Sequence, residues 1–250
     1  MTKIFAHRGC TRDSPENTRP AFATALSCGV DGIEFDVCLS RDGVAMVIHD
    51  ETVDRTSDGS GAISDLTCDQ LHTLDAGSWF DLRFAGERFL TLDGVLDLLA
   101  GRLELNVHLK PSGKATETLV ARTAQALARH GRLSTAYITC DETTLRLARA
   151  AEPGIRVSCL VPHPRNTAAA IDAAIAVGSC NMQVGHQQID RTFVRLAHSR
   201  DLLINAMYLG PAADDFDEIR RLLACGVDGL LLDHAEAWLA AQYPPGTPLS

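Results

Sequence analysis

The chain lacks several features that mark other classes of protein. No two of its eight cysteines are spaced as C-x-x-C, so the sequence does not support a zinc ribbon or a thioredoxin-like redox motif. No apolar run reaches the roughly 18 residues of a membrane span, and the first residues do not resemble a signal peptide. We therefore expect a cytoplasmic protein without stable membrane insertion, in which most cysteines are reduced and structural.

An excess of positive charge is also missing. The sequence contains 23 Lys and Arg residues against 32 Asp and Glu residues, which gives a net charge of −9. This balance argues against nucleic acid or an anionic membrane surface as the main partner. A negatively charged small molecule would need a locally positive site within an acidic protein.

The apolar pattern along the 250 residues is that of a globular α/β protein, with 46% hydrophobic and 22% charged residues. Strand-like runs alternate with longer helical patterns, which favours βα units and a parallel sheet. The expected strands number eight: Lys3–Ala6, Gly32–Val37, Leu103–Leu109, Ala136–Thr139, Arg156–Val161, Cys180–Val184, Leu202–Met207 and Val227–Leu232. Eight βα units in this length predict a (β/α)₈ barrel, although a doubly wound open sheet fits the alternation as well.

Turn residues and composition divide the rest of the chain. Helices are expected over about residues 17–29 and 214–226, each with a glycine at its end. Residues 50–89 break the alternation and are rich in Asp, Ser, Gly and Thr, which predicts an insertion after the second strand that serves the site. Because no linker or internal repeat divides the chain, we expect one barrel domain over residues 1–250.

Two carboxylates share one face of the second expected strand. Glu34 and Asp36 are two residues apart, so their side chains point the same way, while Ile33, Phe35 and Val37 point the other way. Two carboxylates inside a barrel repel each other and are expensive to bury, and a divalent cation with oxygen ligands is the usual remedy. The alternative is an exposed edge strand with a polar face.

The third expected strand repeats this pattern. Asn106, His108 and Lys110 share one face of the run 105–110. A metal ion and a phosphate beside the acidic pair would explain a buried histidine and lysine. We therefore predict His108 as a metal ligand, against the alternative that it bonds to a neighbouring side chain.

Two more histidines stand where apolar runs end. His7 follows the first strand and precedes Arg8, and His49 follows the apolar run 45–48. Catalytic groups cluster at the C-terminal ends of barrel strands, and two histidines can act as base and acid near neutral pH. Arg8 is suited to bind a phosphate oxygen in a planar, bidentate manner. Together with the metal ligands and Lys110, these residues predict a phosphoryl-transfer site.

In this arrangement the sequence resembles the glycerophosphodiester phosphodiesterase family. The ordered matches are His7-Arg-Gly9, Pro15-Glu-Asn-Thr18, Ala21-Phe22, Glu34-Phe-Asp36, Asp42-Gly43, His49-Asp50, Arg55-Thr56, Leu74-Asp-Ala-Gly77, Thr91-Leu92 and Gly226-Val-Asp-Gly229 with Asp233. They are dense over residues 3–110 and sparse afterwards. The ordered set is more specific than any one motif.

The resemblance implies a barrel and metal-dependent hydrolysis of a phosphodiester to a phosphomonoester and an alcohol. It implies acid and base roles for His7 and His49, and metal contacts at Glu34 and Asp36. Arg8 and Lys110 would contact the phosphate. One divalent ion is expected, Mg²⁺ or Ca²⁺ first, with Mn²⁺ or Zn²⁺ as alternatives because of His108.

Three parts of the sequence depart from the family pattern. His108 stands where the family usually has a third carboxylate. The Trp-Thr segment of the seventh strand is replaced by Met207-Tyr208, with Gly210 at the following Asn position, and the Pro expected after Asp233 is Ala235. These changes predict a remade wall of the substrate pocket. A sugar phosphodiester or a lysophospholipid is therefore the alternative substrate, and a phosphate-ligand binding protein with an impaired metal site is the alternative outside enzymes.

Overall fold

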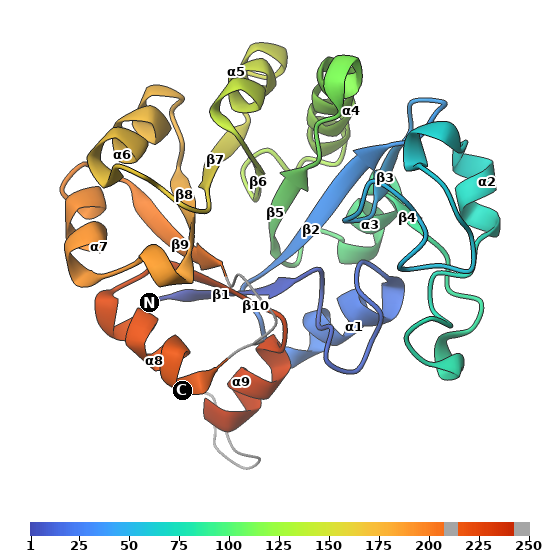
Figure 1. Cartoon of the computed structure of the whole chain (residues 1–250), viewed down its shortest axis with the longest axis horizontal. Helices are drawn as coiled ribbons and strands as arrows, with labels where there is room; N and C mark the ends of the chain where they lie inside the picture. Colours follow the sequence, from blue (N-terminus) through green and yellow to red (C-terminus); the bar gives the residue numbers. More distant parts are fainter. Residues whose placement is uncertain (208–214, 243–250) are drawn as a thin grey trace.

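Eight parallel strands close into a barrel, as the sequence predicted, in a computed structural model that describes residues 1–207 and 215–242 (Figure 1). The ring runs β1, β10, β9, β8, β7, β6, β5, β2 and returns to β1 through the pairing of Phe5–His7 with Gly32–Glu34. The closing pairing excludes the open doubly wound sheet. The barrel strands are β1 (Lys3–His7), β2 (Gly32–Leu39), β5 (Glu104–Leu109), β6 (Ala136–Cys140), β7 (Arg156–Val161), β8 (Asn181–Gly185), β9 (Leu203–Met207) and β10 (Gly229–Leu232).

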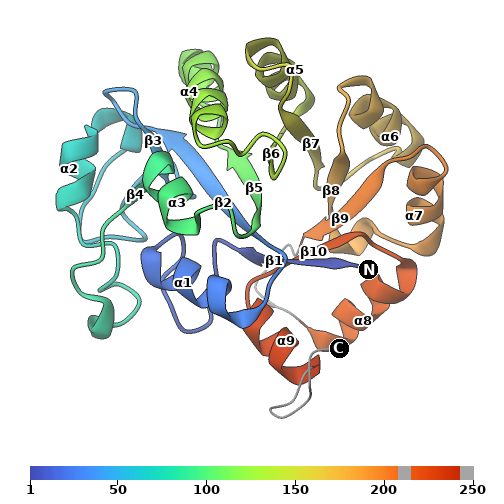
Figure 2. The same cartoon turned by 180° about the vertical axis from the view of Figure 1, so that it is seen from behind.

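Helices surround this ring, and each barrel strand is followed by one of them (Figures 1 and 2). Asp side chains cap several of their first turns, for example Asp141 before α5 and Asp190 before α7. The α8 helix begins two residues after the predicted position 214, which lies outside the described residues. The helices are α1 (Arg19–Cys28), α3 (Leu92–Leu99), α4 (Thr116–Arg129), α5 (Glu142–Ala151), α6 (Thr167–Ala176), α7 (Arg191–His198), α8 (Phe216–Cys225) and α9 (Ala235–Gln242).

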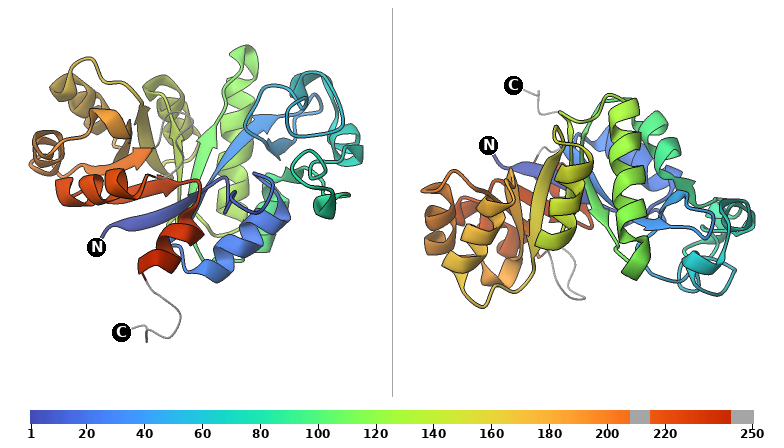
Figure 3. Two further views of the ribbon diagram at one scale, coloured as in Figure 1. Left: turned by 60° about the horizontal axis from the view of Figure 1, so that its bottom comes forward. Right: turned by 90° about the horizontal axis from the view of Figure 1, so that it is seen from above.

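The segment between β2 and α3 adds structure outside the ring. It contains β3 (Ala45–Val47), antiparallel to β2, then α2 (Cys68–Thr73) and β4 (Leu90–Thr91), which pairs with β3. This segment has its own small apolar core and lies at the opposite end of the molecule from α6 and α7 (Figure 3). It therefore extends the barrel on one side, next to the carboxyl end of β2.

Alternation along the strands separates an apolar outer layer from a polar lumen. On β5, Leu105, Val107 and Leu109 are fully buried in the main core beneath the helices. The residues between them, Asn106 and His108, lie in register beside the acidic pair of β2. The alternation thus points the polar residues of two neighbouring strands at one another inside the barrel.

The lumen is closed toward the amino ends of the strands by an apolar plug of Phe5, Tyr137 and Leu231. Gly32 makes room for this plug, because a Cβ there would lie 2.4 Å from the ring of Phe5. Gly32 and Glu34 are on the same face of β2, so the apolar plug and the polar site follow one another along this strand. The eight cysteines form no disulfide. Within residues 1–207 and 215–242, no helix has the length and apolar character needed to cross a bilayer.

Candidate metal centre and active site

A buried cluster of three side chains occupies the lumen at the carboxyl end of β2 and β5. Ligand atoms of Glu34, Asp36 and His108 all lie within 4.8 Å of one another. The Nδ1 atom of His108 is 3.2 Å from Asp36 Oδ1 and 3.7 Å from Glu34 Oε1. The structure therefore brings together all three residues that the sequence predicted as metal ligands.

The donor chemistry of this cluster fits a divalent cation. Both carboxylates are at most 1% exposed, and the buried Asp36 Oδ1 lies 3.2 Å from each of two nitrogens, His108 Nδ1 and Lys110 Nζ. Burial and the neighbouring Asp36 raise the pKa of Glu34. For Asp36 itself burial is outweighed by His108, Lys110 and Arg8, which hold its pKa well below the usual range. Two such carboxylates need a positive partner, which a bound cation supplies.

His7 is held at the edge of this cluster by two acidic residues. Its Nδ1 is 2.5 Å from Asp233 Oδ1, and its Nε2 is 3.7 Å from Glu34 Oε2. Burial lowers the pKa of His7, but the carboxylates of Glu34 and Asp233 together raise it above the ordinary value. Asp233 directly follows β10, so the contact joins the first and last strands of the barrel. Because Asp233 holds Nδ1, the Nε2 atom of His7 points into the cavity.

His49 faces the same cavity from outside the ring. It comes shortly after β3, which is not a barrel strand, so its placement depends on the segment after β2 rather than on a barrel strand end. Its Nδ1 is 2.7 Å from Asp50 Oδ1, which leaves Nε2 as the second nitrogen. Burial lowers the pKa of His49, and the nearby charge of Asp36 offsets this only in part.

Arg8 has a strained backbone at the mouth of the cluster. Its φ of 58° lies in the left-handed region, which costs a non-glycine residue about 1–3 kcal/mol. Its Nη1 donates to Glu16 Oε1 at 2.9 Å, and its Nε is 3.4 Å from Asp36 Oδ2. The neighbouring Gly9 packs so tightly that a Cβ there would lie 2.7 Å from Ala21 Cβ. Tight packing at Gly9 therefore holds the turn in this conformation, in which the side chain of Arg8 points toward the carboxylates of Glu16 and Asp36.

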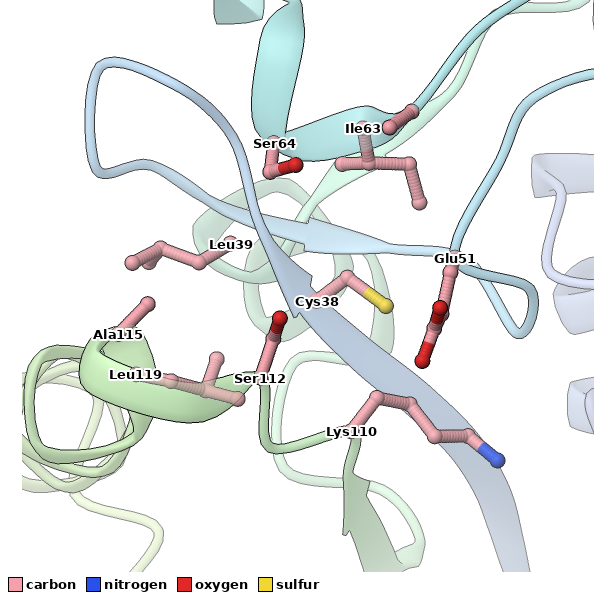
Figure 4. A pocket seen from close by; sticks show the side chains of 10 residues that line it. Cys38, Leu39, Glu51, Ile63, Ser64, Lys110, Ser112, Ala115 and Leu119 are labelled. Carbon is pink, nitrogen blue, oxygen red and sulfur yellow. The ribbon is translucent and has the colours of Figure 1, made fainter.

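Lys110, the residue directly after β5, approaches the carboxylate of Asp36. Its Nζ is 3.2 Å from Asp36 Oδ1. The stem of Lys110 also lines a smaller neighbouring cavity of about 110 Å³, and its ammonium points away from Leu39 and Leu119 of that cavity (Figure 4). The positive charge is therefore directed to the cluster of Glu34, Asp36 and His108 and not to the neighbouring cavity.

The site residues predicted from the sequence all line one cavity of about 430 Å³, except Lys110. The ammonium of Lys110 contacts Asp36, which lines this cavity. No role was predicted from the sequence for the acidic residues Glu16, Asp50 and Asp233 or for Arg55. Arg55 bonds to Glu16 at 2.7 Å and to Asp50 at 2.6 Å, so a chain of ion pairs connects Arg8 with His49. These residues were visible only as parts of the family motifs, because no periodic pattern marks an ion pair, and two of the contacts, His7 with Asp233 and Arg55 with Glu16, join residues 226 and 39 positions apart. Tyr208 and Gly210, which bear on the predicted pocket wall, lie outside the described residues.

Fold and site together define a (β/α)₈ barrel with a candidate metal centre and two flanking histidines. The model of the glycerophosphoryl diester phosphodiesterase family matches residues 7–237, and the chain belongs to this family.

Relatives of known name support this membership. A glycerophosphodiester phosphodiesterase of Caldanaerobacter subterraneus is 47% identical over 110 residues, which are 44% of this chain and 45% of that protein. A putative glycerophosphodiester phosphodiesterase of Bacillus subtilis is 47% identical over 107 residues, 43% of this chain and 44% of that protein. The match thus spans less than half the length of these two relatives.

Solved structures extend the likeness over nearly the whole chain. A glycerophosphodiester phosphodiesterase from Agrobacterium tumefaciens has a TM-score of 0.83 at 31% identity, covering 96% of this chain and 100% of that one. A phosphodiesterase from Oleispira antarctica, solved with the product sn-glycerol-3-phosphate, has a TM-score of 0.89 at 25% identity and covers 97% of each chain.

Proposed function

We propose that this protein is a phosphoric diester hydrolase that cleaves a glycerophosphodiester-like substrate to a phosphomonoester and an alcohol. The observation that carries the proposal is the buried cluster of Glu34, Asp36 and His108, whose ligand atoms lie within 4.8 Å, beside two oriented histidines. Membership of the glycerophosphoryl diester phosphodiesterase family supports it. The whole of residues 1–250 would act as one domain.

Glu34, Asp36 and His108 would hold one divalent cation, which when bound polarises the phosphoryl oxygens. Mg²⁺ and Ca²⁺ suit the two carboxylates, while the imidazole favours Mn²⁺ or Zn²⁺ more than a third carboxylate would. Arg8 and Lys110 would contact the phosphate, and both already lie 3.2–3.4 Å from Asp36. Fixed positive groups of this kind stabilise the charge that develops on the phosphoryl oxygens.

The two histidines divide the proton transfers. Burial lowers the pKa of His49, so its Nε2 is available near neutral pH to take the proton of the nucleophile while Asp50 holds Nδ1. His7 would protonate the leaving oxygen from Nε2 while Asp233 holds its Nδ1. The nucleophile is water or a hydroxyl of the substrate itself, and the second would give a cyclic phosphodiester first.

The proposed partner is a small phosphodiester and not nucleic acid, in accord with the net charge of −9. Eight cysteines without a disulfide support a reducing compartment, for which we propose the cytoplasm. A role in lipid metabolism follows if the substrate is a deacylated phospholipid.

A panel of glycerol, sugar and lipid phosphodiesters tests the function, each assayed with Mg²⁺, Ca²⁺, Mn²⁺ and Zn²⁺ for release of phosphomonoester. Hydrolysis of at least one glycerol or sugar diester that depends on added metal is the expected result. Absence of turnover across the panel would contradict it.

His108 in place of the usual third carboxylate favours one other candidate, a protein that binds a phosphate ligand without cleaving it. Equilibrium binding of the same diesters without product, in a protein with the metal bound, would support that candidate.

A further inference from the structure

Two thiols meet outside the catalytic cavity, between the turn after β1 and the end of α1. Cys10 directly follows the turn that carries Arg8 and Gly9, and Cys28 is the last residue of α1. Their sulfur atoms lie 3.6 Å apart and share a weak hydrogen bond, although the residues are 18 positions apart in the sequence. A disulfide has a sulfur–sulfur distance of about 2.05 Å, so the two atoms would have to approach by about 1.5 Å.

The two thiols differ in exposure and in acidity. Cys10 is 1% exposed, whereas Cys28 is partly exposed. The hydrogen bond from the Cys10 thiol lowers the pKa of Cys28, and burial and the charge of Glu236 oppose this only in part. The same bond, together with burial, raises the pKa of Cys10. Because an accessible thiolate is the group that attacks a disulfide, Cys28 is suited to attack first and Cys10 to attack second.

The turn that carries Cys10 is held on both sides. A Cβ at Gly9 would lie 2.7 Å from Ala21 Cβ, so this part of the turn already packs against α1 at its closest distance. The backbone N–H of Cys10 donates to the carbonyl oxygen of Ala21 at 3.1 Å. The next N–H, that of Thr11, donates to the carbonyl oxygen of Asp233 at 3.2 Å. The turn therefore has little freedom to move toward Cys28.

The end of α1 has more room than the turn. Gly29 ends the helix in the left-handed conformation with φ of 87°, and a Cβ built on it would meet no atom within 4 Å. The helix α9, which carries Glu236, packs beside α1 on the other side (Figures 1 and 2). Closure of the gap between the sulfurs should therefore move Cys28 toward Cys10 and leave the turn in place.

We propose that Cys10 and Cys28 are a redox-sensitive pair that forms a reversible disulfide by exchange with a low-molecular-weight disulfide, and that this bond staples the catalytic turn to α1. The thiolate of Cys28 attacks one sulfur of the small disulfide, which forms a mixed disulfide and releases a small thiolate. The thiol of Cys10 then attacks the sulfur of Cys28, and its proton passes to the second small thiolate as that group leaves. The two cysteines are oxidised and one small disulfide is reduced to two thiols.

This inference is independent of the proposed hydrolase activity, because its test measures a covalent bond and a melting temperature. The folded protein is equilibrated with oxidised glutathione, the remaining thiols are blocked by alkylation, and tryptic peptides are analysed by mass spectrometry. Cys10 leaves in the peptide 9–12, and Cys28 leaves in a longer peptide that ends at Arg41 and also contains Cys38. The wild type is compared with Cys10→Ala and Cys28→Ala, and Cys38→Ala is the matched control.

We expect the two peptides to be joined in the wild type and in Cys38→Ala, and to separate when a reducing agent is added. Cys10→Ala should accumulate a mixed disulfide with glutathione on Cys28, because the second attack is removed, whereas Cys28→Ala should react little because Cys10 is buried. The bond closes a short loop of the unfolded chain, so oxidation should raise the Tm of the wild type by about 3–10 °C. The Tm of Cys28→Ala should not rise on oxidation.

A wild type that stays reduced at every ratio of oxidised to reduced glutathione would overturn the pair, as would a link that forms only after the protein is unfolded. Loss of the link in Cys38→Ala with retention in Cys28→Ala would assign the bond to Cys38 and also overturn the proposal. If the link forms but the Tm of the wild type does not rise, the staple is refuted. Each Tm difference is taken within one protein, so a change in stability caused by the substitution itself cancels.

Discussion

The substitution His108→Gln should weaken metal binding and flatten its dependence on pH. The Nδ1 atom of His108 lies 3.2 Å from Asp36 and 3.7 Å from Glu34, so one ion between the carboxylates would also touch the imidazole. Glutamine keeps a polar side chain of similar length but replaces the nitrogen ligand by an amide. The variant therefore removes the nitrogen ligand and leaves both carboxylates.

The loss of metal affinity in His108→Gln can be estimated from the known effect of removing residues that support a metal ligand. Losing a residue that only supports a ligand commonly costs about 10–100-fold in metal affinity, so losing the ligand itself should cost at least about 100-fold, or roughly 2.7 kcal/mol. Protons compete with metal for an imidazole ligand, so the metal affinity of the wild type should fall as the pH is lowered. The slope should be shallower in the variant.

Calorimetric titration with Mn²⁺ and Mg²⁺ at several pH values measures both quantities. His130→Gln is a matched control, because His130 pairs with Asp93 outside the cavity. Mn²⁺ should lose more affinity than Mg²⁺, since the softer ion gains more from nitrogen. The same affinity and the same pH profile in wild type and His108→Gln would show that the metal rests on the two carboxylates alone.

Three further outcomes are expected. Alanine in place of His7 or His49 should lower kcat/KM by about 10²–10⁴-fold while circular dichroism shows an intact fold, and near-normal turnover of either variant would remove that histidine from the mechanism. Because the pKa of His49 is lowered, its neutral form persists below pH 6.5, so the acid limb of a kcat/KM profile measured at saturating metal should lie below that value; a limb above it under those conditions would refute His49 as the base. Gly9→Ala should destabilise the protein by about 1–3 kcal/mol in urea unfolding, since φ is +87° and the new Cβ would lie 2.7 Å from Ala21, and an unchanged midpoint would count against the tight turn.

The barrel and the cluster of Glu34, Asp36 and His108 were predictable because their signal is local. The alternation of Leu105, Val107 and Leu109 with Asn106 and His108 is visible within six residues, and parallel register then places them beside β2. Several strands start one or two residues later than predicted, as at Gly229 in place of Val227, because the first residues of these runs lie before the first ladder pairing. Several also end one or two residues later, as at Leu39 of β2, where β3 pairs with β2.

Other features depend on contacts that no local pattern encodes. His7 and Asp233 are 226 residues apart, and their contact exists only because β1 and β10 are neighbours in the closed ring. The strand β3 has only three residues and pairs antiparallel with β2, so periodicity could not separate it from a loop. The hydrogen bond from Asn106 Nδ2 to Gln183 Oε1 likewise needs closure of the barrel before it can form.

Metal dependence of phosphodiester cleavage is the most direct test of the central claim. Protein stripped with a chelator is incubated with the best diester of the panel, before and after one divalent cation is restored, and phosphomonoester release is followed in the wild type and in Asp36→Asn. In the wild type, cleavage should require the restored cation. Cleavage should be lost in Asp36→Asn, because the substitution removes a carboxylate that is fully buried beside His108 and Lys110. Undiminished cleavage by the stripped protein, or by Asp36→Asn, would contradict it.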